Sequence, residues 1–128
     1  MNCYVLDASA LLVLLKGEPG SERVIEAITD GASMSAVNFC EVVGKLRDGG
    51  MPEEAIYETL DQLELDIVQF DTLLAYLAGL LRPLTKNAGL SLGDRACLAL
   101  AQHLNLPVLT TDRVWKDLLP AITVQLVR

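Results

Sequence analysis

Apolar and polar positions along the chain follow two alternating patterns. Short runs rich in apolar and β-branched residues predict strands at 2–6, 32–35, 65–68, 107–110 and 122–127. The longer segments between them have apolar residues at helical spacing and predict helices at 8–15, 21–29, 36–47, 52–63, 71–81 and 91–104, with a short helix from 112. A loop containing Pro83, Asn87 and Gly89 separates the last two long helices. Strands that alternate with helices favour an α/β fold with parallel pairing, right-handed crossovers and helices on both faces of the sheet.

The bulk composition narrows the class of protein. A length of 128 residues favours a single domain over 1–128 with a substantial core. Apolar residues make up 52% of the chain, yet the longest apolar stretch, 73–81, is far shorter than the ~20 residues that cross a bilayer. No basic leader precedes the acid at position 7, so we expect a cytoplasmic protein without a membrane anchor. Cys3, Cys40 and Cys97 are widely spaced, which favours buried thiols in a reducing compartment over zinc or disulfides.

The net charge of −7 argues against a simple nucleic-acid-binding module, because such modules normally present a basic face. A nucleic-acid enzyme whose acids are partly neutralised by metal is still compatible with this charge. Lys45 stands four residues after Glu41, and we interpret it as the i,i+4 salt-bridge partner of that acid.

Four carboxylates stand where ligands bind in open α/β sheets. Asp7 and Asp112 directly follow predicted strands, Glu41 lies early in the helix after 32–35, and Asp94 opens the helix 91–104. Ligands of such sheets sit beyond the carboxyl ends of the strands, where helices begin. Acids gathered there repel one another unless a cation lies between them, and Mg²⁺ and Mn²⁺ prefer carboxylate oxygens. The sequence therefore predicts a divalent-metal site suited to phosphoryl transfer.

Neighbouring polar residues add to this prediction. Asn38 and Glu41 are three residues apart, which places them about 60° apart on one helix face. Ser9 follows the first acid by two residues, and Thr110 precedes Asp112 by two.

Each acid also has an ordinary structural role available. Asp7 and Asp112 could cap the helices that follow them, and Ser91 with Asp94 matches a capping box. Glu41 could be a solvated helix residue. A non-catalytic interaction domain is therefore an open alternative at this point.

Other catalytic classes fit the sequence poorly. His103, the only histidine, is nine residues after Asp94, which places it on roughly the opposite helix face and makes it a poor general base. Neither a nucleophile elbow nor a Walker A or GxGxxG loop is present. A haloacid-dehalogenase-like phosphatase would need an aspartate two residues after Asp7, where Ser9 stands.

Five segments carry a resemblance to a known family: VLDASALL at 5–12, EPG at 18–20, SAVNFCEV at 35–42, GLSLGDRACLALA at 89–101 and LTTDRVW at 109–115. In these segments the chain resembles PIN-domain proteins, specifically the VapC-type toxins of toxin–antitoxin pairs. The resemblance covers nearly the whole chain and includes the spacing of all four acids.

The resemblance implies a three-layer α/β/α sandwich around a mostly parallel sheet. It also implies Mg²⁺- or Mn²⁺-dependent endoribonuclease activity, in which metal-activated water hydrolyses RNA phosphodiester bonds. Asp7 and Asp94 match the positions most directly tied to metal, Glu41 and Asp112 match the rest of the acidic quartet, and Thr110 matches the accompanying hydroxyl. The implied partners are a small antitoxin and a second copy of the chain. A housekeeping nuclease in RNA processing is the main alternative.

We also expect an apolar groove for the antitoxin along 8–15 and 21–29. The run Leu11–Leu15 is apolar around the whole helix, which is more than one sheet face needs to bury.

Overall fold

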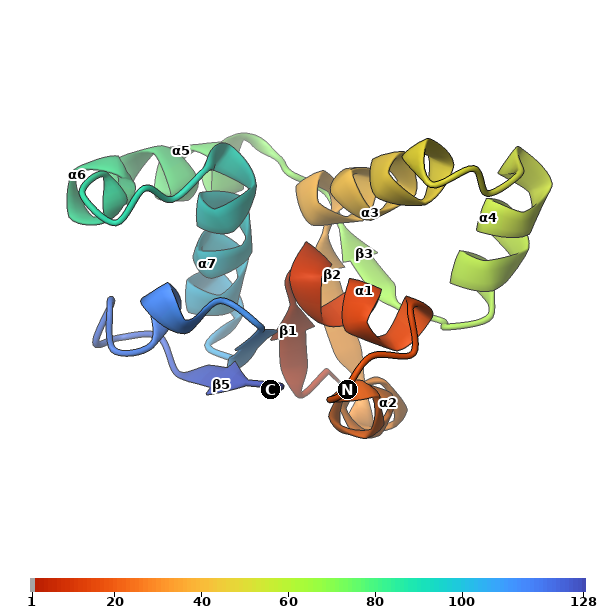
Figure 1. The fold of residues 1–128 in the computed structure, drawn as a ribbon. Helices are drawn as coiled ribbons and strands as arrows, with labels where there is room; N and C mark the ends of the chain where they lie inside the picture. The colour runs from red at the N-terminus through yellow and green to blue at the C-terminus, as the bar shows by residue number, and fades with distance from the viewer. Residues whose placement is uncertain (1) are drawn as a thin grey trace.

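A parallel sheet of five short strands forms the centre of the computed structural model, which describes residues 2–128 (Figure 1). The strands are β1 (Tyr4–Leu6), β2 (Ala32–Ser35), β3 (Asp66–Val68), β4 (Val108–Thr110) and β5 (Val124–Leu126). Their order is β3-β2-β1-β4-β5, and every neighbouring pair is parallel. The predicted α/β class and parallel pairing are therefore confirmed.

Helices connect the strands and cover both faces of the sheet. They are α1 (Ala8–Leu15), α2 (Ser21–Asp30), α3 (Ala36–Asp48), α4 (Glu53–Asp61), α5 (Thr72–Leu80), α6 (Arg82–Thr85) and α7 (Leu92–Leu104), followed by a 3₁₀ turn η1 (Arg113–Trp115). Figure 1 shows α1 to α4 on one side of the sheet and α5 to α7 on the other.

Two apolar cores lie on the two faces of the sheet. Successive strand residues point to opposite faces, so Leu6 and Leu109 join the core formed with α1 to α4. Val5 and Val108 join the core formed with α5, α7 and Trp115. This arrangement is the three-layer α/β/α sandwich that the resemblance implies.

The structure corrects the sequence-based expectations at one cysteine and one loop. Cys40, expected to be buried, is exposed. The segment after residue 81, which the sequence predicts as a loop, contains the short helix α6. This helix tolerates Pro83 in its first turn and is closed by a 2.9 Å hydrogen bond from the Thr85 hydroxyl to the Leu81 carbonyl. In α1, residues 10–13 are buried between the sheet, α2 and α3, whereas Leu14 and Leu15 are half-buried; the antitoxin groove expected along 8–15 and 21–29 stays a prediction. No helix within residues 2–128 is long and apolar enough to span a membrane.

Candidate active site

The order of the sheet brings the predicted site residues to one edge. Strand β1 lies between β2 and β4, so the segments that leave the carboxyl ends of these three strands are neighbours. Asp7 follows β1, α3 follows β2, and Asp112 follows β4. Helix α7 runs back toward β4 and begins at this same edge, where Asp94 lies in its first turn.

Asp7 is the most deeply buried of the four acids, with 5% of its surface exposed. Its carboxylate caps α1 by accepting the Ala10 N–H at 2.8 Å. It also accepts the Ser9 hydroxyl at 2.7 and 2.9 Å and the Thr110 hydroxyl at 2.6 Å. The Ser9 hydroxyl in turn accepts the Thr111 N–H at 3.0 Å, so these contacts join the loops after β1 and β4.

Burial raises the pKa of Asp7 to about 6, from an ordinary value of 3.8. The hydrogen bonds from Thr110, Ala10 and Ser9 act in the opposite direction, and the nearby charge of Asp94 adds a smaller increase in the pKa. Burial therefore contributes more than the repulsion between acids expected from the sequence. Without metal, this carboxyl group therefore titrates near pH 6 and is mostly ionised at neutral pH.

Glu41 lies on α3 and faces the first turn of α7. Its Oε1 accepts a 2.9 Å hydrogen bond from the Asn38 amide, which also donates to the Gly93 carbonyl at 2.9 Å. Asn38 is therefore brought to the site as predicted. Gly93 was not predicted from the sequence, and its place beside Glu41 depends on how two distant helices pack.

Asp94 and Asp112 both have the capping roles that the sequence allowed. Asp94 completes a capping box in which its Oδ2 accepts the Ser91 N–H at 2.9 Å. Asp112 Oδ1 accepts the Val114 N–H at 3.0 Å and so caps η1. In both cases only one carboxylate oxygen is used by the cap, so capping and ligand binding are compatible.

All four acids line one pocket of about 310 Å³. Its lining residues are Asp7, Ala8, Ser9, Asn38, Glu41, Lys45, Asp94, Thr111 and Asp112. Thr110 lies buried beside it in contact with Asp7. Lys45 does not pair with Glu41, because no carboxylate of the described chain lies within 4.0 Å of its amine. It is instead the one basic residue in this lining.

The donor set of the pocket fits a hard divalent cation. Carboxylate oxygens are the ligands that Mg²⁺ and Mn²⁺ prefer, and the buried Asn38 Oδ1 has no hydrogen-bond partner within residues 2–128. No three acidic, thiol or imidazole groups of the described chain are close enough to enclose one ion by themselves. In proteins, Mg²⁺ is usually held by one or two carboxylates and retains several waters.

Two other reactive side chains, those of His103 and Cys97, are not part of the candidate metal site. His103 is exposed in the last turn of α7 and does not line the pocket. Cys97 is fully buried, and burial raises the pKa of its thiol, with further increases from Asp7, Asp94 and Glu41. The thiol therefore stays protonated and serves as core packing.

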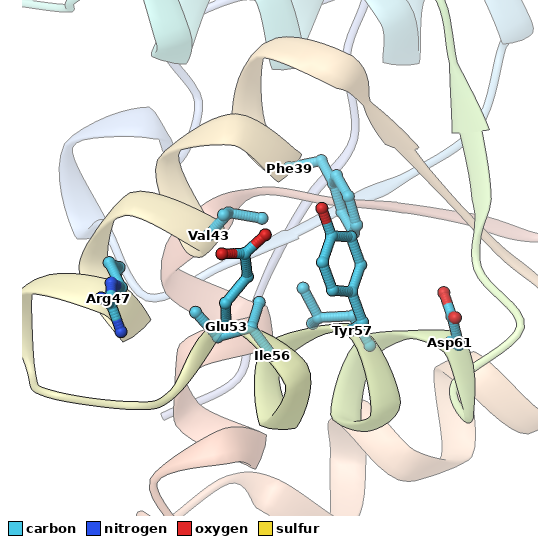
Figure 2. Close-up of a pocket in the computed structure, with 8 residues that line it drawn as sticks. Phe39, Val43, Arg47, Glu53, Ile56, Tyr57 and Asp61 are labelled. Carbon is cyan, nitrogen blue, oxygen red and sulfur yellow. The ribbon is translucent and has the colours of Figure 1, made fainter.

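A second concavity lies between α3 and α4, as Figure 2 shows. It has a volume of about 420 Å³, with apolar walls of Phe39, Val43, Ile56, Tyr57 and Leu60 and charged groups at Arg47, Glu53 and Asp61. Helix α3 therefore separates this groove from the acidic pocket.

A family model described as the PIN domain matches residues 4–118. Solved structures with the same fold include a toxin–antitoxin complex from Klebsiella pneumoniae, with 21% identity, a TM-score of 0.79 and 98% coverage of each chain. A DNA-bound VapBC from Salmonella typhimurium has 17% identity and a TM-score of 0.79 over 100% of each chain. VapBC2 from Rickettsia felis, bound to a fragment of promoter DNA, has 16% identity and a TM-score of 0.76, covering 97% of this chain and 98% of that one. No curated protein matches the sequence.

Proposed function

The chain belongs to the PIN-domain family, and from this membership and the geometry of the pocket we propose that it is a divalent-metal-dependent endoribonuclease. We further propose that it acts in the cytoplasm as the toxin of a toxin–antitoxin pair. The observation that carries the proposal is the convergence of four carboxylates, from four separate segments, on one pocket.

Asp7 and Asp94 would hold Mg²⁺ or Mn²⁺ most directly, and Glu41 and Asp112 would complete the site directly or through water. When bound, the ion would polarise a phosphodiester oxygen and lower the pKa of a water at the site. The chain itself supplies the orientation: Ser9 and Thr110 fix the buried Asp7 carboxylate by donating hydrogen bonds to it.

The proposed substrate must approach an acidic surface. The chain carries a net charge of −7, so RNA binding before catalysis is expected to be weak and to depend on metal and on a few local cations. Lys45 is well placed for this role, since its exposed side chain reaches the pocket and forms no ion pair within residues 2–128. Lysine binds phosphate as a flexible point charge.

The groove between α3 and α4 is the proposed site of the antitoxin. Its apolar walls suit the apolar face of a helix, and the charged groups at its edges suit a polar rim (Figure 2). Tyr57 is 60% exposed, although it lies among buried apolar neighbours such as Ile56 and Leu60. The VapBC and toxin–antitoxin assemblies with this fold support a protein partner.

A homodimer contact is proposed on the outer face of α5 and α6. Leu73, Tyr76, Leu80 and Leu84 are each more than half exposed, and residues 72–81 contain no charged side chain. A shallow depression at Ala75 and Gly79 lies beside the protruding Tyr76 and Leu80. A surface with both a hollow and a protrusion can pair with its own copy across a two-fold axis.

The test of the function is incubation of pure, antitoxin-free protein with a panel of structured RNAs, with and without Mg²⁺. We expect internal cleavage only with the metal, and none by Asp94→Asn. A protein that leaves every RNA intact with Mg²⁺ would contradict the nuclease assignment. A short reading frame directly upstream would favour the toxin role, and its absence would favour a housekeeping nuclease.

A further inference from the structure

Gly93 occupies a position where any side chain would collide with Glu41. A Cβ atom placed on Gly93 would fall well inside the contact distance of Glu41 Oε1, 2.9 Å from Cδ and 3.0 Å from Oε2. The φ angle of Gly93 is ordinary for a helix, so backbone conformation does not require glycine here. What requires it is the space taken by the carboxylate.

The Asn38 amide holds Glu41 in that space. Its Nδ2 donates to Glu41 Oε1 and to the Gly93 carbonyl, both at 2.9 Å. Two acceptors on the same side fix the orientation of the amide, because the reversed amide would place its oxygen against both of them. Asn38 is 2% exposed, so water offers little competition for these bonds.

We infer that Gly93 and Asn38 are positioning residues that seat the Glu41 carboxylate against the first turn of α7, beside Asp94. Glu41 comes from α3 and Asp94 from α7, and the Asn38 amide is the hydrogen-bonded link between these two helices at the site. The inference rests on the proposed metal-dependent function. It adds to that function the two residues that set the spacing between the Glu41 and Asp94 carboxylates.

Gly93→Ala separates positioning from folding. The group that must move is the free end of an exposed glutamate, which can swing into solvent without disturbing the core. Alanine is also a better helix former than glycine, so the fold should not be weakened. We expect metal affinity to fall while the melting temperature of the metal-free protein stays the same or rises.

The experiment measures Mn²⁺ affinity by calorimetry for the parent, Gly93→Ala, Glu41→Ala and the double variant. Gly93→Ala should bind Mn²⁺ about tenfold more weakly, the usual scale for groups that orient a metal ligand. Glu41→Ala removes the carboxylate that the added methyl group would displace, so the double variant should bind within about threefold of Glu41→Ala alone, a non-additive result. Gly44→Ala is the matched control on α3, because nothing lies within 4 Å of its added Cβ.

Asn38→Ala provides an independent test, and it should also weaken Mn²⁺ binding. Parent-like Mn²⁺ affinity in both Gly93→Ala and Asn38→Ala would overturn the inference while leaving the nuclease proposal intact. Strictly additive losses in the double variant, or unfolding of Gly93→Ala, would also overturn it. A parent protein that binds no Mn²⁺ would instead remove the metal site on which the proposed function depends.

Discussion

Asp7→Asn should stabilise the metal-free protein at neutral pH. The pKa of Asp7 is about 6 in the fold against an ordinary 3.8, so the folded state holds the proton more tightly than the unfolded state. Below pH 3.8, Asp7 is protonated in both the folded and the unfolded state, so it does not lower the free energy of unfolding. Between pH 3.8 and 6 stability falls as pH rises, and above pH 6 the whole cost is present.

The size of this cost follows from the difference in pKa. About two pH units at 1.36 kcal/mol each give about 3 kcal/mol at pH 7.5 for the buried carboxylate. Asparagine keeps the size of the side chain, and its oxygen can still accept the Ala10 N–H. The variant should therefore melt higher than the parent at pH 7.5, by roughly 10 °C at most, and equal to it near pH 4.

Thermal and urea unfolding in EDTA at pH 4, 6 and 7.5 would measure the effect. The fluorescence of Trp115, which is 1% exposed, reports on unfolding. Glu58→Gln, an exposed acid on α4, is the control and should show no such pH dependence. A stability difference between Asp7→Asn and the parent that is the same at all three pH values, or a variant less stable at pH 7.5, would refute the reasoning. Added Mn²⁺ should stabilise the parent more than Asp7→Asn, so that the parent then melts at the higher temperature.

Four further outcomes are expected. Mn²⁺ affinity should fall below pH 6, because the proton on Asp7 competes with the metal; calorimetry across pH 5–8 checks this. His103→Gln should keep RNA cleavage within about threefold, since the ring is exposed away from the pocket. Lys45→Ala should weaken RNA binding and reduce the salt slope of log K by about 0.7, whereas Lys86→Ala should not, as salt titrations would show. Leu80→Glu should convert a dimer to a monomer in sedimentation experiments, because a charge would be buried in the apolar contact.

The sequence predicted the elements wherever the pattern of apolar residues was long and regular. The helix from 91 was placed within one residue of α7 because Ser91 and Asp94 form the capping box that the residues suggested. Helix α6 was missed because it has only four residues around Pro83 and depends on the Thr85 side chain and its neighbours. Short elements of this kind are determined by tertiary contacts rather than by local propensity.

The convergence of the four acids could be predicted from their places after strands and at helix starts, whereas contacts between distant segments could not. Asp7 can be recognised from the sequence because it both follows a strand and caps the next helix. The role of Gly93 exists only through Glu41 on another helix, so no local pattern marks it. Lys45 was assigned to Glu41 by its spacing alone, and the structure turns it toward the pocket without an ion pair among the described residues.

The burial of α1 is another feature that the sequence alone does not determine. Residues 11–15 are apolar around the helix, and the sequence cannot say whether the outer side is covered. In the fold, residues 10–13 are buried against the sheet, α2 and α3, Leu14 and Leu15 are half-buried, and an apolar groove lies between α3 and α4.

The chemistry of the cleaved ends tests the central claim most directly. Four converging carboxylates and a single, exposed histidine favour hydrolysis by water over attack by the ribose 2′-hydroxyl, which usually needs histidine-like acid–base groups. RNA cut by the pure protein with Mg²⁺ or Mn²⁺ should carry 5′-phosphate and 3′-hydroxyl ends, and cleavage should stop with EDTA. A 2′,3′-cyclic phosphate product, or cleavage that continues in EDTA, would contradict the account.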